Sequence, residues 1–240
     1  MGLAFGGALA AILLTTVVLA ALQPGLALAQ TSAPDPKTRL DDLFARIESE
    51  QRQLKTLSAR FEQRQEGPLL LEPEVATGQF YYRAPDQMSW QYESPERTLI
   101  VLRGTEILTW YQDQGYAERL DGGRQAKRLW RALGAIYLGT PQALADLRRY
   151  FHLHVTFAEA LEPLHFALEP RDSTIARRVQ AVDIWLDPEK LLPVRLRQAA
   201  PDGSATEFQF EDLQPNAEID PERFEPLLPP DVDLTERGGR

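Results

Sequence analysis

Turn signals that recur about every eight to twelve residues are the feature that most constrains the fold of this chain. Groups such as Gly67-Pro68, Ala84-Pro85-Asp86 and Pro201-Asp202-Gly203 separate short segments in which apolar and polar residues alternate. Alternation with a period of two indicates half-buried strands, and turns at this spacing are typical of antiparallel β-structure. The predicted strands cover about residues 56–66, 75–82, 88–92, 98–102, 107–111, 116–120, 153–157, 164–168, 182–186, 192–196 and 206–210. The chain is therefore predicted to be mainly β within the α+β class, with about eleven strands and no repeat of fixed period.

Two segments keep a helical spacing of apolar residues instead. The first covers residues 36–53. The second, at 124–151, interrupts the series of strands and is predicted to form two helices, because Gly139 ends one and Thr140-Pro141 starts the next. A sheet with one apolar face has to bury that face, and these helices are the segments that can cover it. We therefore expect a curved, incomplete antiparallel β-barrel with an N-terminal helix and a helical lid at about residues 124–151. The apolar lid residues are Leu129, Trp130, Leu133, Ile136 and Leu144. The Pro-rich end at 221–230 is expected to run extended along the sheet and to hold Phe224 against it.

The predicted sheet carries unusually bulky side chains, among them Phe80, Trp90 and Trp110. Ordinary core packing explains any one of them. As a set, beside a helical insertion that could swing, they indicate a lined cavity, because ligand sites are concave and mostly apolar. The predicted lining consists of Phe80, Tyr82, Met88, Trp90, Val101, Leu108 and Trp110.

The N-terminus has the pattern of an export signal. Residues 3–22 carry no charge, and Pro24-Gly25 and Ala27-Leu28-Ala29 follow them. Small residues at 27 and 29 fit a peptidase site, so we expect a signal peptide at 1–29 that is cleaved after Ala29. An apolar stretch of this length can also remain as an uncleaved membrane anchor, and no Lys or Arg precedes it. Either interpretation places the rest outside the cytoplasm, as a flexible tail at 30–37 and one domain at 38–236.

No catalytic constellation is apparent in the sequence. The sharpest metal-site candidate is His152-x-His154 with His165 on the next strand, because three histidines can bind zinc. Alternation places these histidines opposite Leu153 and Val155, on the face that should be solvated, so we favour solvated histidines. With no Cys and a net charge of −9, the chain lacks thiolate chemistry and the basic surface of a nucleic-acid-binding protein. We expect no enzyme activity, no metal or cofactor and no nucleic acid.

An ordered series of short motifs resembles the LolA family, the periplasmic carriers of outer-membrane lipoproteins. The resemblance covers about residues 38–235. The motifs are Leu57-x-Ala59-x-Phe61-x-Gln63, Gly78-Gln79-Phe80, Pro85-x-x-Met88-x-Trp90-x-Tyr92-x-x-Pro95, Gly104 with Leu108 and Trp110-Tyr111, Gly203-x-x-Thr206, Phe210-x-x-Leu213-x-x-Asn216, Phe224, and Pro229-Pro230-x-Val232.

This resemblance implies a specific fold and function. The fold would be an incomplete barrel of eleven strands under a helical lid, and the interior would take the acyl chains of a lipoprotein. It also implies a basic residue next to the Pro after the second strand, in contact with the lid. Arg83 is the candidate, although it stands one residue earlier in Arg83-Ala84-Pro85, and alternation would turn it to the opposite face.

The implied partners are acylated lipoproteins, an inner-membrane ATP-driven exporter that loads the carrier, and an outer-membrane acceptor lipoprotein; the carrier itself would be a monomer. The acceptor shares the fold but is lipidated, a role that the absence of Cys excludes here. The alternative is a periplasmic sensor or regulator that binds lipid or lipoprotein on the same fold.

Overall fold

The computed structural model describes residues 36–121, 143–157 and 162–238. Contacts divide the chain into two units, Met1–Pro34 and Asp35–Arg240, and every described element belongs to the second. The predicted signal peptide, its cleavage point after Ala29 and most of the predicted tail therefore lie outside the described residues. Four of the five lid residues, Leu129, Trp130, Leu133 and Ile136, also lie outside them.

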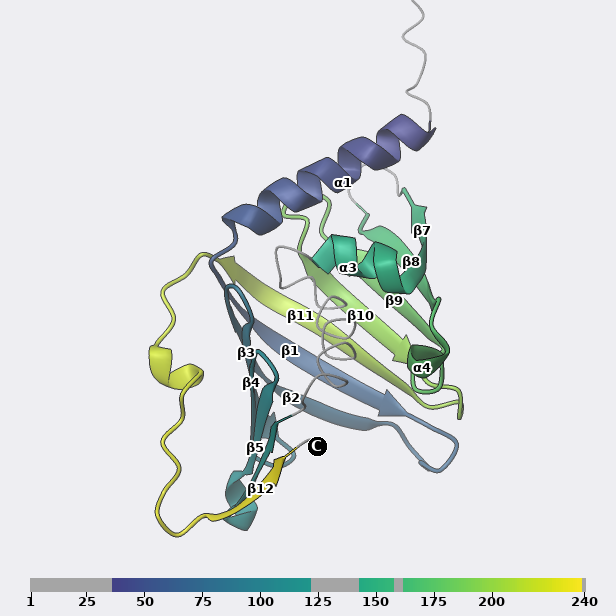
Figure 1. The fold of residues 1–240 in the computed structure, drawn as a ribbon. Coiled ribbons are helices and arrows are strands. Elements are labelled where there is room, and N and C mark those ends of the chain that lie inside the picture. The colour runs from purple at the N-terminus through teal and green to yellow at the C-terminus, as the bar shows by residue number, and fades with distance from the viewer. Residues whose placement is uncertain (1–35, 122–142, 158–161, 239–240) are drawn as a thin grey trace, which may run out of the picture. The chain divides into compact units, whose positions relative to one another are not determined.

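Strands dominate the described residues (Figure 1). They are β1 (Thr56–Glu66), β2 (Glu74–Arg83), β3 (Gln87–Ser94), β4 (Thr98–Arg103), β5 (Glu106–Tyr111), β6 (Tyr116–Asp121), β7 (Phe151–Thr156), β8 (Leu164–Pro170), β9 (Ala181–Leu186), β10 (Pro193–Ala199), β11 (Ala205–Pro215) and β12 (Asp233–Gly238). The helical elements are α1 (Pro36–Gln53), α3 (Ala143–Tyr150), α4 (Ser173–Ala176), η1 (Gln112–Gln114) and η2 (Pro221–Arg223). The eleven predicted strands correspond to β1 to β11.

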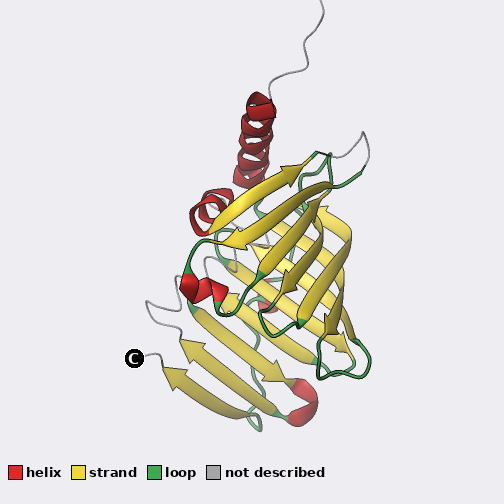
Figure 2. Ribbon diagram, turned by 90° about the vertical axis from the view of Figure 1, so that its right-hand side faces the viewer, coloured by secondary structure: helices red, strands yellow, loops and turns green. Residues whose placement is uncertain are grey.

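The twelve strands form one curved sheet, and Figure 2 shows how it bends around. The order is β12-β6-β5-β4-β3-β2-β1-β11-β10-β9-β8-β7. The β12 and β7 strands are the two edges, so the sheet is not closed in the described part of the chain. This confirms the predicted incomplete β-barrel.

The two longest strands, β1 and β11, lie side by side at the centre of the sheet. They pair antiparallel, with Phe61 opposite Phe210 and Gln63 opposite Phe208. Directly opposite residues share a face of the sheet, so this register places the three phenylalanines together. We call the face that carries them the inner face and the opposite one the outer face. Alternation in the sequence therefore predicts which residues of β1 are buried.

Gly78 lies where β2 and β3 approach each other closely. A Cβ atom at this position would lie 2.0 Å from the backbone oxygen of Gln91 and 2.9 Å from the Phe61 ring. The pairing of β2 with β3 also shifts register between Thr77 and Gly78. A strand glycine often marks such a bulge, and here only glycine leaves room for the neighbouring strand.

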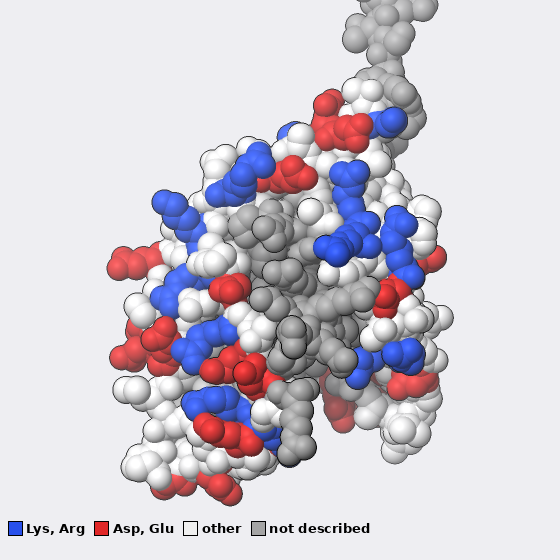
Figure 3. All heavy atoms as spheres, in the orientation of Figure 1, with Lys and Arg blue, Asp and Glu red and all other residues white. Residues whose placement is uncertain are grey.

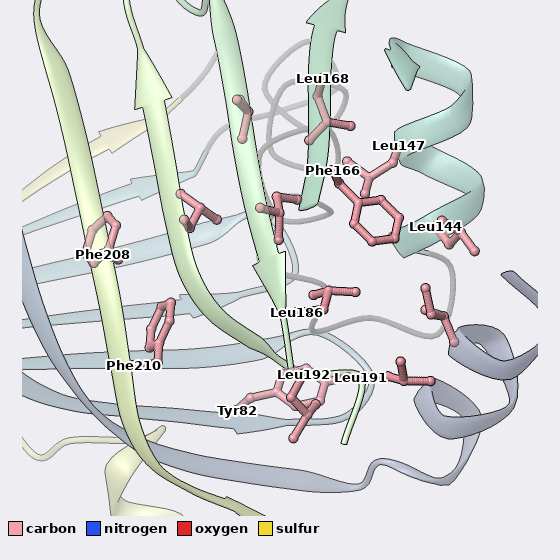
Figure 4. Close-up of a cluster of buried hydrophobic side chains, with 14 of the residues drawn as sticks. Tyr82, Leu144, Leu147, Phe166, Leu168, Leu186, Leu191, Leu192, Phe208 and Phe210 are labelled. Carbon is pink, nitrogen blue, oxygen red and sulfur yellow. The ribbon is translucent and has the colours of Figure 1, made fainter. Parts of the chain in front are cut away.

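Two helices add apolar side chains to the core on the inner face. The buried residues are Leu43, Phe44 and Ile47 of α1 and Leu144, Leu147 and Tyr150 of α3. Figure 4 shows Leu147 of α3 beside Phe166 of β8. The predicted helix at 36–53 is confirmed as α1. The predicted second helix extends to residue 151, whereas α3 ends at Tyr150 and the fully buried Phe151 begins β7.

The C-terminal segment departs from the sequence-based prediction in two respects. Residues 221–223 form the 3-10 helix η2 and are not extended, with the Asp220 side chain accepting a hydrogen bond from the Glu222 N–H. As predicted, Phe224 is buried, with 0% of its surface exposed. The segment then forms β12, which pairs parallel with β6. Alternation did not predict this twelfth strand because its sequence, D-L-T-E-R-G, has only one large apolar residue. The strand covers the edge of β6, which would otherwise be open to pairing with another chain.

Candidate functional site

An aromatic cluster occupies the middle of the inner face. It consists of Phe61, Phe80, Trp90, Phe208 and Phe210, all of them buried. The Trp90 ring centroid lies 4.5 Å from that of Phe80, 5.0 Å from that of Phe208 and 5.1 Å from that of Phe61. The rings are tilted or edge-to-face, as aromatic pairs prefer. The cluster is therefore a packed apolar surface contributed by β1, β2, β3 and β11.

A cavity of about 640 Å³ adjoins the aromatic cluster, and we call it the inner pocket. Its lining residues are Gln63, Gln65, Glu74, Val75, Ala76, Tyr92, Pro95, Glu96, Thr98 and Ile100. The exposed side chains of Glu74, Val75 and Glu96 mark the part of the lining that reaches solvent. A cavity of this volume is within the usual range for small-molecule sites.

Tyr92 connects the aromatic cluster to the inner pocket. Its ring centroid lies 5.0 Å from that of Phe61, and its hydroxyl donates a hydrogen bond to Gln63 Oε1 at 2.5 Å. Burial raises the pKa of Tyr92 to about 12, so the hydroxyl remains a donor at neutral pH. The site thus combines an apolar aromatic wall with a pocket that is lined largely by polar side chains, an arrangement that suits an amphiphilic ligand with a hydrocarbon chain.

Tyr82 and Met88 extend the apolar surface toward the start of β1. They are directly opposite each other on β2 and β3, and 1% and 3% of their surfaces are exposed. Burial, with a smaller contribution from the nearby Asp86 carboxylate, raises the pKa of Tyr82. Both belong to the same core cluster as Phe80 and Trp90. Four of the seven predicted cavity residues therefore lie together on the inner face.

The other three predicted cavity residues, Val101, Leu108 and Trp110, lie in a second cluster, which we call the outer cluster. The residues packed there are Leu99, Val101, Leu108, Ala117, Trp110, Leu228, Val232 and Leu234. Val101 is opposite Leu108, and Leu99 is opposite Trp110, so these side chains share the outer face. The seven residues therefore do not line one surface, and the prediction of a single lining is corrected in this respect.

Alternation could not assign β4 to a face because L-I-V-L at 99–102 is a continuous apolar run. The sequence-based lining also lacks Phe61, Phe208 and Phe210. Their alternation is visible in the sequence, but the pairing of β1 with β11 joins segments about 150 residues apart. The pairing of β1 with β11 brings Phe208 and Phe210 to Trp90, and the order of β1, β2 and β3 brings Phe61 to it.

Leu144 is the one predicted lid residue that the structure describes. It is 1% exposed and belongs to the inner-face core cluster together with Phe80 and Trp90. In Figure 4, it lies on α3, while Leu147 of the same helix points toward β8. A role in covering a ligand remains a prediction for this residue.

Comparison with known proteins identifies the family. The model of the family described as "Outer membrane lipoprotein carrier protein LolA" matches residues 52–226. The chain belongs to the LolA family. An outer-membrane lipoprotein carrier protein of Alkalilimnicola ehrlichii is 31% identical over 229 residues, covering 94% of this chain and 96% of that relative. One of Nitrosospira multiformis is 27% identical over 166 residues, covering 67% and 72%.

A solved structure supports the fold of this LolA-family chain. An uncharacterized conserved protein from Thermus thermophilus has a TM-score of 0.51 and 9% sequence identity, covering 83% of this chain and 99% of that protein. At this identity the likeness concerns the fold alone.

The basic residue that the family resemblance placed near the lid lies on the outer face. The Arg83 guanidinium is 4.6 Å from the Phe224 ring centroid and 3.8 Å from a carboxylate oxygen of Glu225. Its Nε also donates to Gln87 Oε1 at 2.5 Å. Among the described residues, these contacts are all on the C-terminal segment or at the β2–β3 turn. The lid contact of Arg83 remains a sequence-based prediction that these contacts do not support.

The three histidines of this LolA-family chain do not converge. His152 and His154 are exposed on β7, as alternation predicted, while a His165 ring nitrogen lies 2.7 Å from Asp183 Oδ1. In residues 36–121, 143–157 and 162–238, no group of three or more His, Cys, Asp or Glu residues is placed to hold a metal. Among the same residues, no helix is long and apolar enough to cross a membrane.

Charged side chains of both signs are interspersed over the described part of the face seen in Figure 3. In the described part of the chain, ion pairs also join neighbouring strands, such as Arg119 Nη1 with Glu236 Oε1 at 2.9 Å. Mixed charge of this kind favours solubility, since it produces no extended field of one sign.

Proposed function

We propose that this chain is a periplasmic carrier that binds the acyl chains of lipoproteins on its inner face. In this proposal it transfers them, without catalysis, from the inner membrane to an outer-membrane acceptor. The observation that carries the proposal is the aromatic cluster that continues into a 640 Å³ pocket in a member of the LolA family. Trp90 and Phe61 would contact the hydrocarbon, while Gln63 and Tyr92 offer polar groups where the chain joins its head group.

The energetics of acyl binding require a mechanism for release. Burying an acyl chain of about 16 carbons at roughly 0.8 kcal/mol per CH₂ gives about 12 kcal/mol before any cost, which corresponds to nanomolar binding. A carrier this tight would release its cargo too slowly. In our proposal, the lid residues Leu129, Trp130, Leu133, Ile136 and Leu144 occupy the inner face when cargo is absent. Displacing these side chains costs free energy, which offsets part of the free energy gained by burying the acyl chain. The remaining affinity permits transfer.

The remaining proposals concern the pathway. The relatives from Alkalilimnicola and Nitrosospira are named outer-membrane lipoprotein carrier proteins, which supports a lipoprotein cargo for this chain. An inner-membrane ATP-driven exporter would load it, and an outer-membrane acceptor lipoprotein would receive the cargo. We further propose export to the periplasm by the signal peptide at 1–29, with cleavage after Ala29.

The test is whether the mature protein extracts a triacylated lipoprotein from membranes into a soluble 1:1 complex. An acceptor added afterwards should take up the cargo. Extraction followed by transfer supports a carrier. A stable complex that never transfers its cargo would favour the alternative, a sensor or regulator with the same pocket. Failure to bind either a lipoprotein or a fluorescent acyl probe would contradict both.

A matched pair of variants tests the place of binding. Ile100 lines the inner pocket and Leu228 packs against the outer cluster, and both are half-buried. An acyl chain in the pocket would remove water from a carboxylate at position 100, which costs free energy. Ile100→Asp should therefore weaken binding of the acyl probe by about tenfold or more, whereas Leu228→Asp should leave it unchanged. Equal losses in the two variants, at equal stability, would argue against the inner pocket as the site.

A further inference from the structure

The turn between β1 and β2 carries leucine side chains that the core does not use. The exposed fraction is 97% for Leu69 and 105% for Leu71, against 45% for Val75 in β2. Leu70, between the two exposed leucines, is half-buried. We call residues 68–73, P-L-L-L-E-P, the leucine tip. Large apolar side chains this exposed, within one short turn, commonly mark a surface that contacts protein or lipid.

Two prolines and a neighbouring turn restrict the backbone of the leucine tip. Pro68 and Pro73 fix the backbone at both ends. A Cβ atom at Gly203, in the turn between β10 and β11, would lie 3.3 Å from Pro68, so the two turns are in contact. The strands on either side, β1 and β2, belong to the centre of the sheet. The tip therefore presents its leucines from a rigid base.

The backbone of the leucine tip has few free donors. Its two prolines have no N–H group, and the Leu70 N–H donates to the Gly67 carbonyl at 3.1 Å. Unpaired backbone donors are a main cost of moving a loop from water into a lipid interface. Three of the six residues, the two prolines and Leu70, therefore bring no unpaired N–H group into the interface, which favours lipid contact.

The position of the tip connects it to the inner pocket. Gln65 at the end of β1 and Glu74 and Val75 at the start of β2 flank the tip, and all three line the pocket. Val75 continues the apolar surface from the tip to the pocket. A tip seated in a lipid surface would place the pocket opening at that surface, where an acyl chain leaves or enters the bilayer.

The acidic residues around the tip favour contact with zwitterionic over anionic lipid surfaces. Glu66, Glu72 and Glu74 surround the leucines, and Arg64 is paired with Glu66 at 2.9 Å. This acidic border is repelled by anionic head groups and tolerated by zwitterionic ones. Because few side chains can insert, the contact would be weak and reversible.

We propose that the leucine tip inserts transiently into the interface of a zwitterionic phospholipid bilayer and brings the inner pocket to the membrane surface. The purpose of this contact rests on the proposed carrier function, but the contact itself can be measured without cargo.

Vesicles of phosphatidylethanolamine and phosphatidylcholine provide the probe. Since both leucines are exposed, Leu69→Ser with Leu71→Ser should fold normally, and Leu227→Ser, at an 88% exposed site in the C-terminal segment, is the matched control. In flotation assays we expect the double variant to bind vesicles about tenfold or more weakly than wild type, and the control to bind like wild type. Adding phosphatidylglycerol should weaken wild-type binding at low salt. Equal flotation of wild type and double variant, or tighter binding to anionic vesicles, would overturn the proposal.

Binding of a fluorescent acyl probe in the absence of vesicles separates the two proposals. We expect the double variant to bind the probe like wild type, because the leucine tip does not line the pocket. If transfer to the acceptor fell while vesicle binding stayed equal, the tip would contact a protein partner and the lipid proposal would be wrong. If the wild-type protein does not bind the acyl probe, the carrier function is contradicted, whereas the lipid contact of the leucine tip is not.

Discussion

At the scale of single residues, Tyr92 joins the two parts of the candidate site. It contacts the aromatic cluster through its ring and the inner pocket through its hydroxyl, which hydrogen-bonds Gln63. Neither contact could be predicted from the sequence. The strand alternation places Tyr92 on the same face as Trp90, but the partner at Gln63 depends on the order of β1, β2 and β3 in the sheet.

Tyr92 should make the stability of the protein depend on alkaline pH. Its pKa is raised from 10.0 to about 12 in the folded state, so the unfolded chain loses this proton first. Stability should therefore fall as the pH rises from about 10 to 12, while below about pH 10 this group adds no pH dependence. In urea unfolding, Tyr92→Phe should reduce that fall. Tyr82 is present in both proteins, so the difference isolates Tyr92. An unchanged pH dependence would contradict the burial of this hydroxyl.

At the scale of elements, the sequence predicts strands better than it predicts their partners. Alternation in T-L-S-A-R-F predicts the start of β1, and the polar residues that follow continue the strand to Glu66, its observed end. It fails for β12, where charged residues dominate, because that strand is held by pairing with β6 and by Leu234 in the outer cluster. Alternation also does not show which side chains of β4 lie on the inner face, because its apolar run fits either face. The core therefore could be predicted, whereas the division into inner and outer clusters needed the sheet order.

The C-terminal segment depends on Phe224 as its buried anchor. Phe224 is fully buried, and Arg83 lies over its ring at 4.6 Å. Phe224→Ala should lower the free energy of unfolding by about 3–5 kcal/mol, because truncation leaves a cavity. The control is Leu227→Ala, at an 88% exposed position, which should change stability by less than about 0.5 kcal/mol. Denaturant unfolding measures both.

Since Phe224 is not part of the inner face, its loss should leave the affinity of the folded protein for an acyl probe unchanged. A small effect of Phe224→Ala on stability, or a selective loss of probe binding, would show that the segment has a different role from the structural one described.

At the scale of the whole molecule, one open sheet separates two apolar surfaces. The inner face carries the aromatic cluster and the inner pocket, and the outer cluster is packed under the C-terminal segment. Because the two surfaces are separate, each has its own predicted role. Cargo should contact only the inner face, and the outer cluster should serve stability.

Three of the four tryptophans report on the two faces separately, and the fourth, Trp130, lies outside the described residues and is kept in all proteins compared. Trp90 belongs to the inner aromatic cluster, Trp110 packs against the outer cluster, and Trp185 stacks on His165 at a centroid distance of 4.8 Å. A bromine-labelled acyl chain quenches the fluorescence of tryptophans that it touches, because quenching by bromine needs near contact. Three variants, Trp90→Phe, Trp110→Phe and Trp185→Phe, each remove one reporter.

The most direct test of the account is quenching by this labelled acyl chain in wild type and the three variants. If cargo binds on the inner face, Trp90→Phe should remove a substantial part of the quenched signal, while Trp110→Phe and Trp185→Phe should leave the quenched signal as large as in wild type. Quenching that persists fully in Trp90→Phe and is lost in Trp110→Phe would place the acyl chain on the outer face and contradict the account.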